Sequence, residues 1–349
     1  HERMGYMLDK IPPFADSPAA WTADDMEMDK SWIINLSEAD LKELNIATLK
    51  LHERGISPLE FKQSDFQLPT LAPKIASLLR EIEYGRGFAL LRGLNVSDYS
   101  LDQLSVLYWG LGTHLGEIIS QNSQGDLLGR VTDMEGGKFV KGGYYEQGVR
   151  GHRTSAFLPP HSDSSDVVGL MCVRPAKKGG ESWISSSLAV YNEIRSRRSD
   201  LLAPLLSGFR YDLIGKGRTA GELTNNRLPV YSWYEGLLSC RFNKQQIELG
   251  AKRAGEKLTD LQQEAIDLFE EIALSDKFLL RMLFEPGDIQ LLNNHTTVHS
   301  RGQFVDFEEA EKRRLLLRLW VNIPNGRPLA PEYADRLNTG GRGGVTKRL

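Results

Sequence analysis

The 349-residue sequence predicts a mainly β protein with added helices, of the α+β class. Apolar segments of strand length recur along the chain, and turns rich in Gly and Pro separate them. Helical patterns interrupt these segments irregularly rather than alternating with them, which favours a sandwich or barrel over βαβ units. The expected strands cover residues 87–93, 167–173, 182–186, 237–242, 289–292 and 315–323.

Helices are predicted where apolar residues recur every three or four positions or where a capping pattern opens a segment. Ser37 is a plausible N-cap for a short helix, and a longer apolar pattern from Leu71 stops at Gly85. Two capping boxes, Ser100 with Gln103 and Thr259 with Gln262, open two further helices. Residues 115–150 are rich in Gly, Asn and Asp and show little periodicity, so we expect a long loop there. The expected helices cover residues 37–44, 71–84, 100–111, 188–198 and 259–274.

Composition and charge narrow the class of protein. The 43 Lys and Arg residues against 46 Asp and Glu residues leave no basic excess, so no nucleic acid partner is expected. No apolar run reaches the ~20 residues that cross a bilayer, so no membrane partner is expected. Cys172 and Cys240 lie in apolar stretches, which predicts buried free thiols in a reducing compartment. Because no secretory signal is visible, we expect a cytoplasmic protein that acts on a small molecule and could form a homo-oligomer.

One elaborated domain accounts for the length, because barrel and sandwich domains often exceed about 200 residues. Residues 1–66 are polar and are interpreted as an N-terminal extension that packs on the core. Residues 67–330 form the main domain, with an insert at about 187–280, and residues 331–349 form a C-terminal tail.

The candidate metal ligands are histidines and an aspartate. His161 and Asp163 lie two residues apart, and in an extended strand both side chains point to one face. A later strand leads into a segment that holds His295 and His299. Two His and one Asp form the facial ligand set that leaves positions open on Fe(II). Zn²⁺ could use the same ligands, so this set alone does not identify the metal.

The segment 313–321, RRLLLRLWV, predicts a strand with two different faces. Read with period 2, one face carries three Leu and one Val, and the opposite face carries Arg314 and Arg318. If the second face lines a barrel interior, the guanidinium groups need anions, because burying an unpaired charge is costly. A planar guanidinium matches a carboxylate through two parallel hydrogen bonds. The alternative is an edge strand whose arginines are solvated.

These elements, in this order and spacing, resemble the TauD/TfdA family, the taurine-dioxygenase-like Fe(II)/2-oxoglutarate-dependent oxygenases. The resemblance covers residues 68 to 323, about three-quarters of the chain. Besides the histidine motifs and the RRLLLR strand, it rests on the GFALLRGL strand and on the GGESW and EPGD turns. It implies a double-stranded β-helix (jelly-roll) core and dependence on Fe(II), 2-oxoglutarate and O2.

The resemblance also implies roles for individual residues. Arg314 corresponds to the residue that binds the distal carboxylate of 2-oxoglutarate, and Ser182 replaces the family's threonine beside it. The interval from His299 to Arg314 is about four residues longer than in the taurine enzyme, so Arg313 remains an alternative for this contact. The iron ligands that the resemblance implies are His161, Asp163 and His299.

Arg318 corresponds to the position at which the taurine enzyme binds its substrate sulfonate, although in relatives this arginine can support the cosubstrate instead. An anionic substrate such as an amino acid is therefore expected. His295 is expected to be structural, and Asp166 is expected to form hydrogen bonds rather than to bind metal. The other candidate pocket residues are Asn122, Tyr144, Tyr145, Arg153, Phe157 and Leu158.

The implied reaction couples decarboxylation of 2-oxoglutarate to succinate with oxidation of a C–H bond of the substrate, in specialised metabolism or catabolism. The outcome would be hydroxylation, with desaturation or ring closure as variants. Two other classes stay open. A zinc hydrolase that uses the same ligands would need a carboxylate base near the metal-bound water. A jelly-roll binding protein would carry out no reaction at all.

Overall fold

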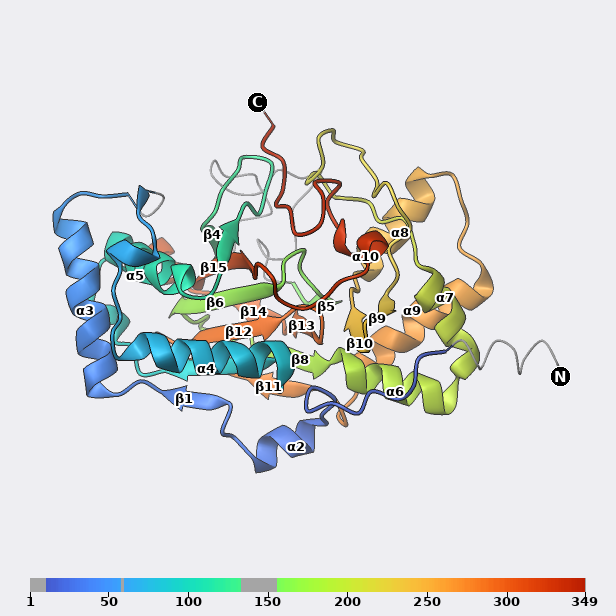
Figure 1. Cartoon of the computed structure of the whole chain (residues 1–349), viewed down its shortest axis with the longest axis horizontal. Helices are drawn as coiled ribbons and strands as arrows, with labels where there is room; N and C mark the ends of the chain where they lie inside the picture. The colour runs from blue at the N-terminus through green and yellow to red at the C-terminus, as the bar shows by residue number, and fades with distance from the viewer. Residues whose placement is uncertain (1–10, 58–59, 133–155, 349) are drawn as a thin grey trace.

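The computed structural model describes residues 11–57, 60–132 and 156–348, and its core is built from two β-sheets (Figure 1). The larger sheet has the strand order β1-β2-β12-β6-β15-β3, and β4 also pairs with β15. Its strands are β1 (Ile33–Asn35), β2 (Phe88–Arg92), β3 (Glu117–Ile119), β4 (Gly129–Thr132), β6 (Val167–Arg174), β12 (Ile289–Asn293) and β15 (Leu315–Asn322).

The second sheet has the order β11-β8-β13-β5 and lies across the interior from the first. Apolar side chains of both sheets meet in one buried cluster, which includes Phe88 and Trp320 from the larger sheet and Ile184 and Leu280 from the smaller. The two sheets thus form the jelly-roll core that the resemblance implied. The strands of the second sheet are β5 (Leu158–His161), β8 (Ser182–Ser186), β11 (Leu280–Met282) and β13 (Thr297–Arg301).

Alternate side chains of strand β15 lie in two different environments, one outside the larger sheet and one between the two sheets. Leu315, Leu317, Leu319 and Val321 point outward into a cluster that helices also line. Leu316 points inward, into the cluster between the sheets. The predicted separation of faces is therefore confirmed, and it places Arg314 and Arg318 on the inner side of the sheet.

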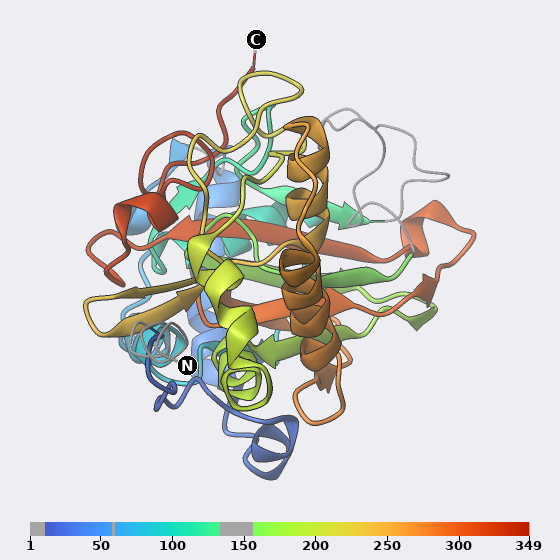
Figure 2. The same cartoon turned by 90° about the vertical axis from the view of Figure 1, so that its right-hand side faces the viewer.

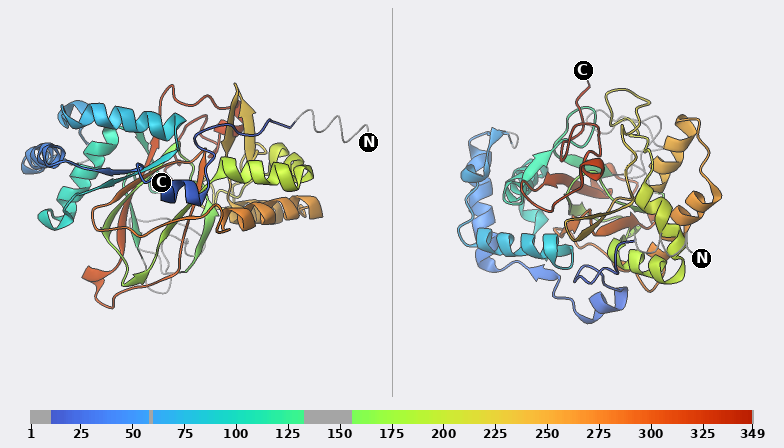
Figure 3. Two further views of the ribbon diagram at one scale, coloured as in Figure 1. Left: turned by 90° about the horizontal axis from the view of Figure 1, so that it is seen from below. Right: turned by 45° about the vertical axis from the view of Figure 1, so that its right-hand side comes forward.

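Helices cover the outer face of the larger sheet, and Figure 3 shows them on the side of the sheets opposite the insert. The capping box of Ser100 and Gln103 opens α5 (Leu101–Thr113), and α4 (Leu71–Tyr84) ends at Gly85, as predicted. Helix α3 (Glu38–Glu53) begins after Ser37 but runs nine residues beyond the predicted end at 44. It continues because Ala47 and Leu51 are buried in the outer cluster.

The prediction of a continuous loop over residues 115–150 was wrong in its first part. Both β3 and β4 lie there, and each pairs antiparallel with β15. Strands of three or four residues are too short to show a period, so pairing with an existing sheet edge defines them. Residues 133–155 lie outside the part of the chain that the structure describes.

The segment between β8 and β11 forms a helical layer beside the smaller sheet, and Figure 2 views it from the front. It has its own buried cluster, in which Phe242 stacks on Phe269 with ring centroids 3.9 Å apart. The elements of this insert are α6 (Ser187–Arg197), α7 (Leu202–Ser207), β9 (Tyr231–Tyr234), β10 (Leu237–Cys240), α8 (Lys244–Arg253) and α9 (Asp260–Ala273).

The two ends of the described chain both pack on the core. Near the N-terminus, Trp21 precedes helix α2 (Ala23–Met28) and Trp32 follows it. Their rings flank Phe88 of β2 at centroid distances of 5.1 and 5.4 Å. Near the C-terminus, Tyr333 of α10 (Pro331–Ala334) and Val345 are buried.

The two cysteine side chains are buried free thiols, as predicted. No helix in the described part of the chain is both long enough and apolar enough to span a bilayer.

Candidate active site

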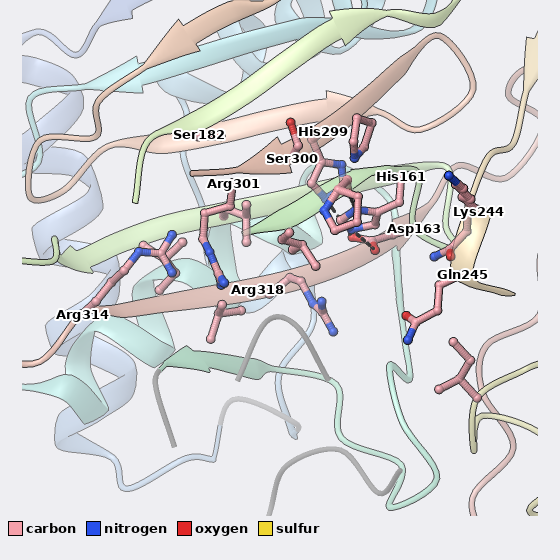
Figure 4. A pocket seen from close by; sticks show the side chains of 18 of the residues that line it. His161, Asp163, Ser182, Lys244, Gln245, His299, Ser300, Arg301, Arg314 and Arg318 are labelled. Carbon is pink, nitrogen blue, oxygen red and sulfur yellow. Dashed lines mark hydrogen bonds and ion pairs between the residues drawn. The ribbon is translucent and has the colours of Figure 1, made fainter. Parts of the chain in front are cut away.

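A cavity of about 170 Å³ opens between the two sheets, and three kinds of side chain line it (Figure 4). The first kind is a group of potential metal ligands from β5, from the loop after it and from β13; Asp163 lies in that loop and not on the strand that the sequence predicted. The second is a set of arginines from β13 and from the start and middle of β15. The third comes from the insert, where residues 243–245 and Leu249 close one side.

The histidines and the aspartate predicted as ligands come together at this cavity. His161 and His299 are cross-strand partners in the β5–β13 pair, and their ring centroids lie 4.3 Å apart. The Nε2 atoms of both histidines lie 3.6 Å from the carboxylate of Asp163. In the described part of the chain this is the one group of three His, Cys, Asp or Glu residues with ligand atoms within 4.8 Å of one another.

The protonation of the two imidazoles suits metal binding. His161 Nδ1 lies 2.9 Å from the carbonyl oxygen of Pro159, so an N–H donated there leaves the lone pair of Nε2 directed at the ligand group. Burial lowers the pKa of His299 to about 3, with the nearby His161 acting in the same direction. At neutral pH His299 is therefore the neutral imidazole that a metal requires.

His295 points away from this group. Its Nε2 lies 2.8 Å from the carboxylate of Asp166, and its Nδ1 lies 2.7 Å from the hydroxyl of Tyr333. Both His295 and Asp166 are buried and engaged in hydrogen bonds. The structure therefore agrees with the structural role predicted for both residues.

Arg314 reaches the cavity immediately before β15. Its backbone N–H donates to the carboxylate of Asp306, and its backbone carbonyl accepts from Thr132 Oγ1, so the base of the side chain is fixed. The residue is 4 % exposed, and its Nη1 is a buried donor with no hydrogen-bond partner in the described structure. Burial lowers the pKa of the guanidinium to about 10. An anion beside Arg314 would relieve this desolvation.

Arg313, the alternative to Arg314, points elsewhere. Its guanidinium donates to the carbonyl oxygens of Phe307 and Glu308 in the preceding hairpin. It is absent from the described lining of the cavity. The additional hairpin residues between His299 and Arg314 thus do not shift the register of the arginine that enters the cavity.

Arg318 lies further along the same strand and is held in position by a glutamine that the sequence analysis did not identify. Its Nε donates to Gln121 Oε1 at 2.9 Å, while Gln121 Nε2 donates back to the Arg318 carbonyl at 2.7 Å. The guanidinium carbon lies 5.1 Å from the ring centroid of Trp320. Burial lowers the pKa of Arg318 to about 9.

A third arginine, Arg301, also lines the cavity and was missed from the sequence. It is two residues beyond His299 on β13, so strand parity places both side chains on one face. The guanidinium carbons of Arg301 and Arg314 lie 4.9 and 5.1 Å from the ring centroid of Phe304. Because alternate residues of a strand share a face, counting two residues on from His299 would have identified Arg301.

Ser182 lies on β8 and lines the cavity, as predicted. Its hydroxyl is within hydrogen-bond distance of the side-chain amide of Gln290, with Oγ–Oε1 and Oγ–Nε2 distances of 3.2 and 3.1 Å. Gln290 points inward from β12, and it is fully buried. This partner could not be predicted from local patterns, because β8 and β12 belong to different sheets.

The remaining predicted pocket residues have mixed positions. Leu158 lines the cavity. Asn122 is not among the described residues that line the cavity, and its side chain holds the turn at 122–126, so its contact with the substrate stays a prediction. Phe157 is also absent from the described lining. It is 42 % exposed and packs beside Trp183. Tyr144, Tyr145 and Arg153 lie outside the described residues.

Comparison with known proteins identifies the family. The model of the family described as taurine catabolism dioxygenase TauD, TfdA family matches residues 52–320. The chain belongs to the TauD/TfdA family. It is an Fe(II)- and 2-oxoglutarate-dependent dioxygenase that uses O2, and the family assignment confirms the predicted enzyme class and cofactors.

Two curated relatives are similar over most of this TauD/TfdA chain. FR-33289 synthase of Streptomyces rubellomurinus is 31 % identical over 312 residues, which cover 88 % of this chain and 90 % of the relative. The taurine hydroxylase-like protein SAT17 of Stachybotrys chartarum is 30 % identical over 310 residues, which cover 86 % and 77 %.

Solved structures share the fold at low sequence identity. Asparagine oxygenase in complex with Fe(II), hydroxyasparagine and succinate has a TM-score of 0.63 at 17 % identity, covering 83 % of this chain and 93 % of its own. The non-heme iron oxygenase OrfP in complex with Fe and α-ketoglutaric acid has a TM-score of 0.58 at 14 % identity, covering 84 % and 94 %.

The residues present fit the family's cofactors. Two imidazoles with one carboxylate suit Fe(II) and leave coordination positions open. The buried donor of Arg314 in the same cavity suits the carboxylate of a cosubstrate. Asp163 is the one carboxylate among the described residues that line the cavity. A zinc hydrolase would therefore find no second acid there among the described residues to act as its base.

Proposed function

We propose that this TauD/TfdA oxygenase oxidises a C–H bond of a small anionic substrate such as an amino acid, and that hydroxylation is the outcome. His161, Asp163 and His299 would hold Fe(II), and Arg314 with Ser182 would hold 2-oxoglutarate. Arg318 would bind the anionic group of the substrate. The observation that carries this proposal is the position of both arginines in the cavity of the His/Asp/His group.

Arg314 supports the cosubstrate role through its geometry and charge. Its backbone is held by Asp306 and Thr132, and Phe304 lies beside the guanidinium, so the start of the side chain is in place before any ligand arrives. Gly180 leaves space beside it, since a Cβ there would lie 3.3 Å from Arg314 Nε, and its φ of +72° favours glycine. A bidentate contact to the distal carboxylate would orient the other end of 2-oxoglutarate toward the metal group.

Arg318 supports the anionic-substrate role because it lies further along the cavity. Four residues of strand separate it from Arg314 by about 13 Å at the backbone. We therefore infer that two separate anions, rather than one, meet these two arginines. Gln121 engages Nε of Arg318, and this contact sets the direction of the guanidinium plane.

The bound iron supplies the oxidising chemistry, by coupling decarboxylation of 2-oxoglutarate to C–H oxidation. The chain's own residues bind, orient and shield the reactants. Arg314 and Arg318 fix the two acids at separate points, and apolar side chains such as Leu158, Leu170 and Leu316 border the space between them. Excluding water from this space strengthens the arginine contacts and protects the reacting centre from side reactions.

The named ligands of fold neighbours support an amino acid as the substrate class. The asparagine oxygenase structure contains hydroxyasparagine. A structure of OrfP with Fe and L-Arg has a TM-score of 0.57 at 16 % identity and covers 91 % of this chain and 99 % of its own. Both ligands are small α-amino acids that carry a carboxylate.

The substrate proposal is tested by screening amino acids and keto acids for stimulated succinate formation, each beside its neutral ester or amide. We expect the free acids to be preferred, because the neutral derivatives lose the charge-assisted contact to Arg318. Arg318→Gln should reduce that preference while leaving the fold intact. Neutral derivatives that react as well as the acids would contradict the proposal.

Gln290 provides a second prediction about the cosubstrate site. Its amide can donate to Ser182 Oγ, which frees the hydroxyl hydrogen for the 2-oxoglutarate carboxylate. Gln290→Leu should weaken 2-oxoglutarate binding by about 0.5–1.5 kcal/mol, the usual net value of one hydrogen bond. Titration of the Fe(II)-loaded enzyme with 2-oxoglutarate measures the effect. An unchanged dissociation constant in a folded variant would show that Ser182 needs no such support.

A further inference from the structure

The loop that carries Asp163 is pinned at nearly every residue. Residues 162–166 connect β5 to β6, and all five are buried. The Asp163 N–H donates to Asn294 Oδ1 at 3.1 Å, and Arg241 donates to Ser164 Oγ at 2.9 Å. The direction of the Asp163 carboxylate between the two histidines therefore depends on contacts that hold this short loop.

Asp166 is the most heavily bonded member of the loop. One carboxylate oxygen lies 2.8 Å from His295 Nε2 and 3.4 Å from Arg336 Nη2. The other accepts from Arg342 Nε at 2.8 Å and from the Ile323 N–H at 3.0 Å. Although burial acts in the opposite direction, the hydrogen bond from His295 and the charges of the two arginines hold the pKa of Asp166 well below its usual value.

Both arginines belong to the C-terminal segment, beyond the part of the chain that the family model matches. Arg336 is 3 % exposed, and its Nη1 also donates to the Ser165 carbonyl at 3.0 Å. It thus binds two consecutive residues of the loop. From the sequence, residues 331–349 were predicted only to form a C-terminal tail, with no role in the site.

The backbone around Arg342 is shaped to deliver its side chain to Asp166. The sequence is Gly340-Gly341-Arg342-Gly343-Gly344, and Arg342 itself has a φ of +62°. A Cβ at position 343 would lie 2.3 Å from Thr339 Oγ1, so only glycine fits there without a shift. A left-handed conformation at a non-glycine residue costs about 1 kcal/mol and persists where surrounding contacts impose it. The contact with Asp166 is one that does so.

We infer that Arg336 and Arg342 are positioning residues for the metal centre, which hold Asp163 in place by clamping Asp166 and Ser165 from the C-terminal segment. The inference rests on the proposed role of Asp163 as a metal ligand. Removing either guanidinium takes a hydrogen bond and a positive charge away from the buried carboxylate of Asp166. We expect the loop then to shift toward other hydrogen-bond partners or water. Loss of such an outer contact typically weakens metal binding 10- to 100-fold.

The experiment measures Co(II) binding by equilibrium dialysis of the metal-free full-length protein, without 2-oxoglutarate or substrate. Arg342→Gln is the main variant, because its side chain is 25 % exposed and the fold should tolerate the change. Arg336→Gln is the second. Arg348→Ala is the matched control, since this arginine lies in the same segment but its side chain donates to the Gly215 carbonyl instead.

We expect the Co(II) dissociation constant to rise 10- to 100-fold in Arg342→Gln, to recover partly in Arg342→Lys, and to remain unchanged in Arg348→Ala. Combining Arg342→Gln with Asp166→Asn should weaken binding no more than Asp166→Asn alone, because the arginine acts through that carboxylate. Circular dichroism and thermal unfolding verify that each variant is folded. If Arg336→Gln fails to fold, the Arg342 series decides the question.

Two results would overturn the inference. One is wild-type Co(II) affinity in a folded Arg342→Gln variant. The other is equal weakening in Arg348→Ala, which would indicate general loosening of the segment. Asp163→Ala separates this outcome from a failure of the proposed function. If Asp163→Ala binds Co(II) normally, the ligand assignment itself is wrong, whereas loss in Asp163→Ala alone rejects only the role of the C-terminal arginines.

Discussion

Replacement of His299 by Ala is expected to abolish turnover and to remove Fe(II) binding, while His295→Ala should keep all three ligands and weaken metal binding only in part. The reason is geometric, because His299 Nε2 lies 3.6 Å from Asp163, whereas His295 is bonded to Asp166 and Tyr333. A facial site with two remaining ligands cannot hold Fe(II) in an open geometry. His161→Ala and Asp163→Ala should behave like His299→Ala.

Metal content after anaerobic loading, measured beside succinate formation, checks this result. His295→Ala serves as the comparison on the same chain segment, and it should lose stability and only part of the metal affinity, because it removes one contact each from Asp166 and Tyr333 and none of the three ligands. Full iron content in His299→Ala together with loss of iron in His295→Ala would reverse the ligand assignment.

Arg314→Ala is expected to weaken 2-oxoglutarate binding by about 2–5 kcal/mol, which corresponds to about 30-fold or more in the dissociation constant. The guanidinium is 4 % exposed, so its contact with a carboxylate is not screened by solvent. Arg314→Lys should recover only part of the affinity, because an ammonium cannot make the planar bidentate contact. The prime substrate should be affected far less.

The measurement is a titration of the metal-loaded protein with 2-oxoglutarate, followed by a separate titration with the prime substrate. Arg313→Ala is the control, since its side chain donates to the preceding hairpin and is not among the described residues that line the cavity. Equal weakening of both ligands in Arg314→Ala would indicate a disturbed barrel rather than a lost contact.

Helix starts and strand faces could be predicted from the sequence, because residues close together in the chain determine them. The N-caps at Ser37, Ser100 and Thr259 were correct, because a capping box depends on residues three positions apart. The two faces of β15 were also correct, since alternation along one strand is visible in its own sequence. The convergence of the His/Asp/His group followed from the family resemblance, because β5 ends at His161 and the strand parity expected for Asp163 does not apply in the loop that carries it.

Features that depend on distant partners could not be predicted in this way. Strands β3 and β4 exist because β15 offers an edge, and nothing in their own sequences shows it. Gln121 holds Arg318 across 197 positions of sequence, and Arg342 reaches Asp166 across 176. The turn that the Asn122 side chain builds with the backbone of residues 124 and 126 was not predicted either.

The most direct test of the proposed site is the discrimination between 2-oxoglutarate and 2-oxopentanoate, which lacks the distal carboxylate. The ratio of their dissociation constants is measured in the metal-loaded wild type, Arg314→Ala and Arg318→Ala. The account predicts strong preference for 2-oxoglutarate in the wild type and in Arg318→Ala, and loss of that preference in Arg314→Ala alone. Loss of the preference in Arg318→Ala, with its retention in Arg314→Ala, would contradict the account and assign the cosubstrate to Arg318.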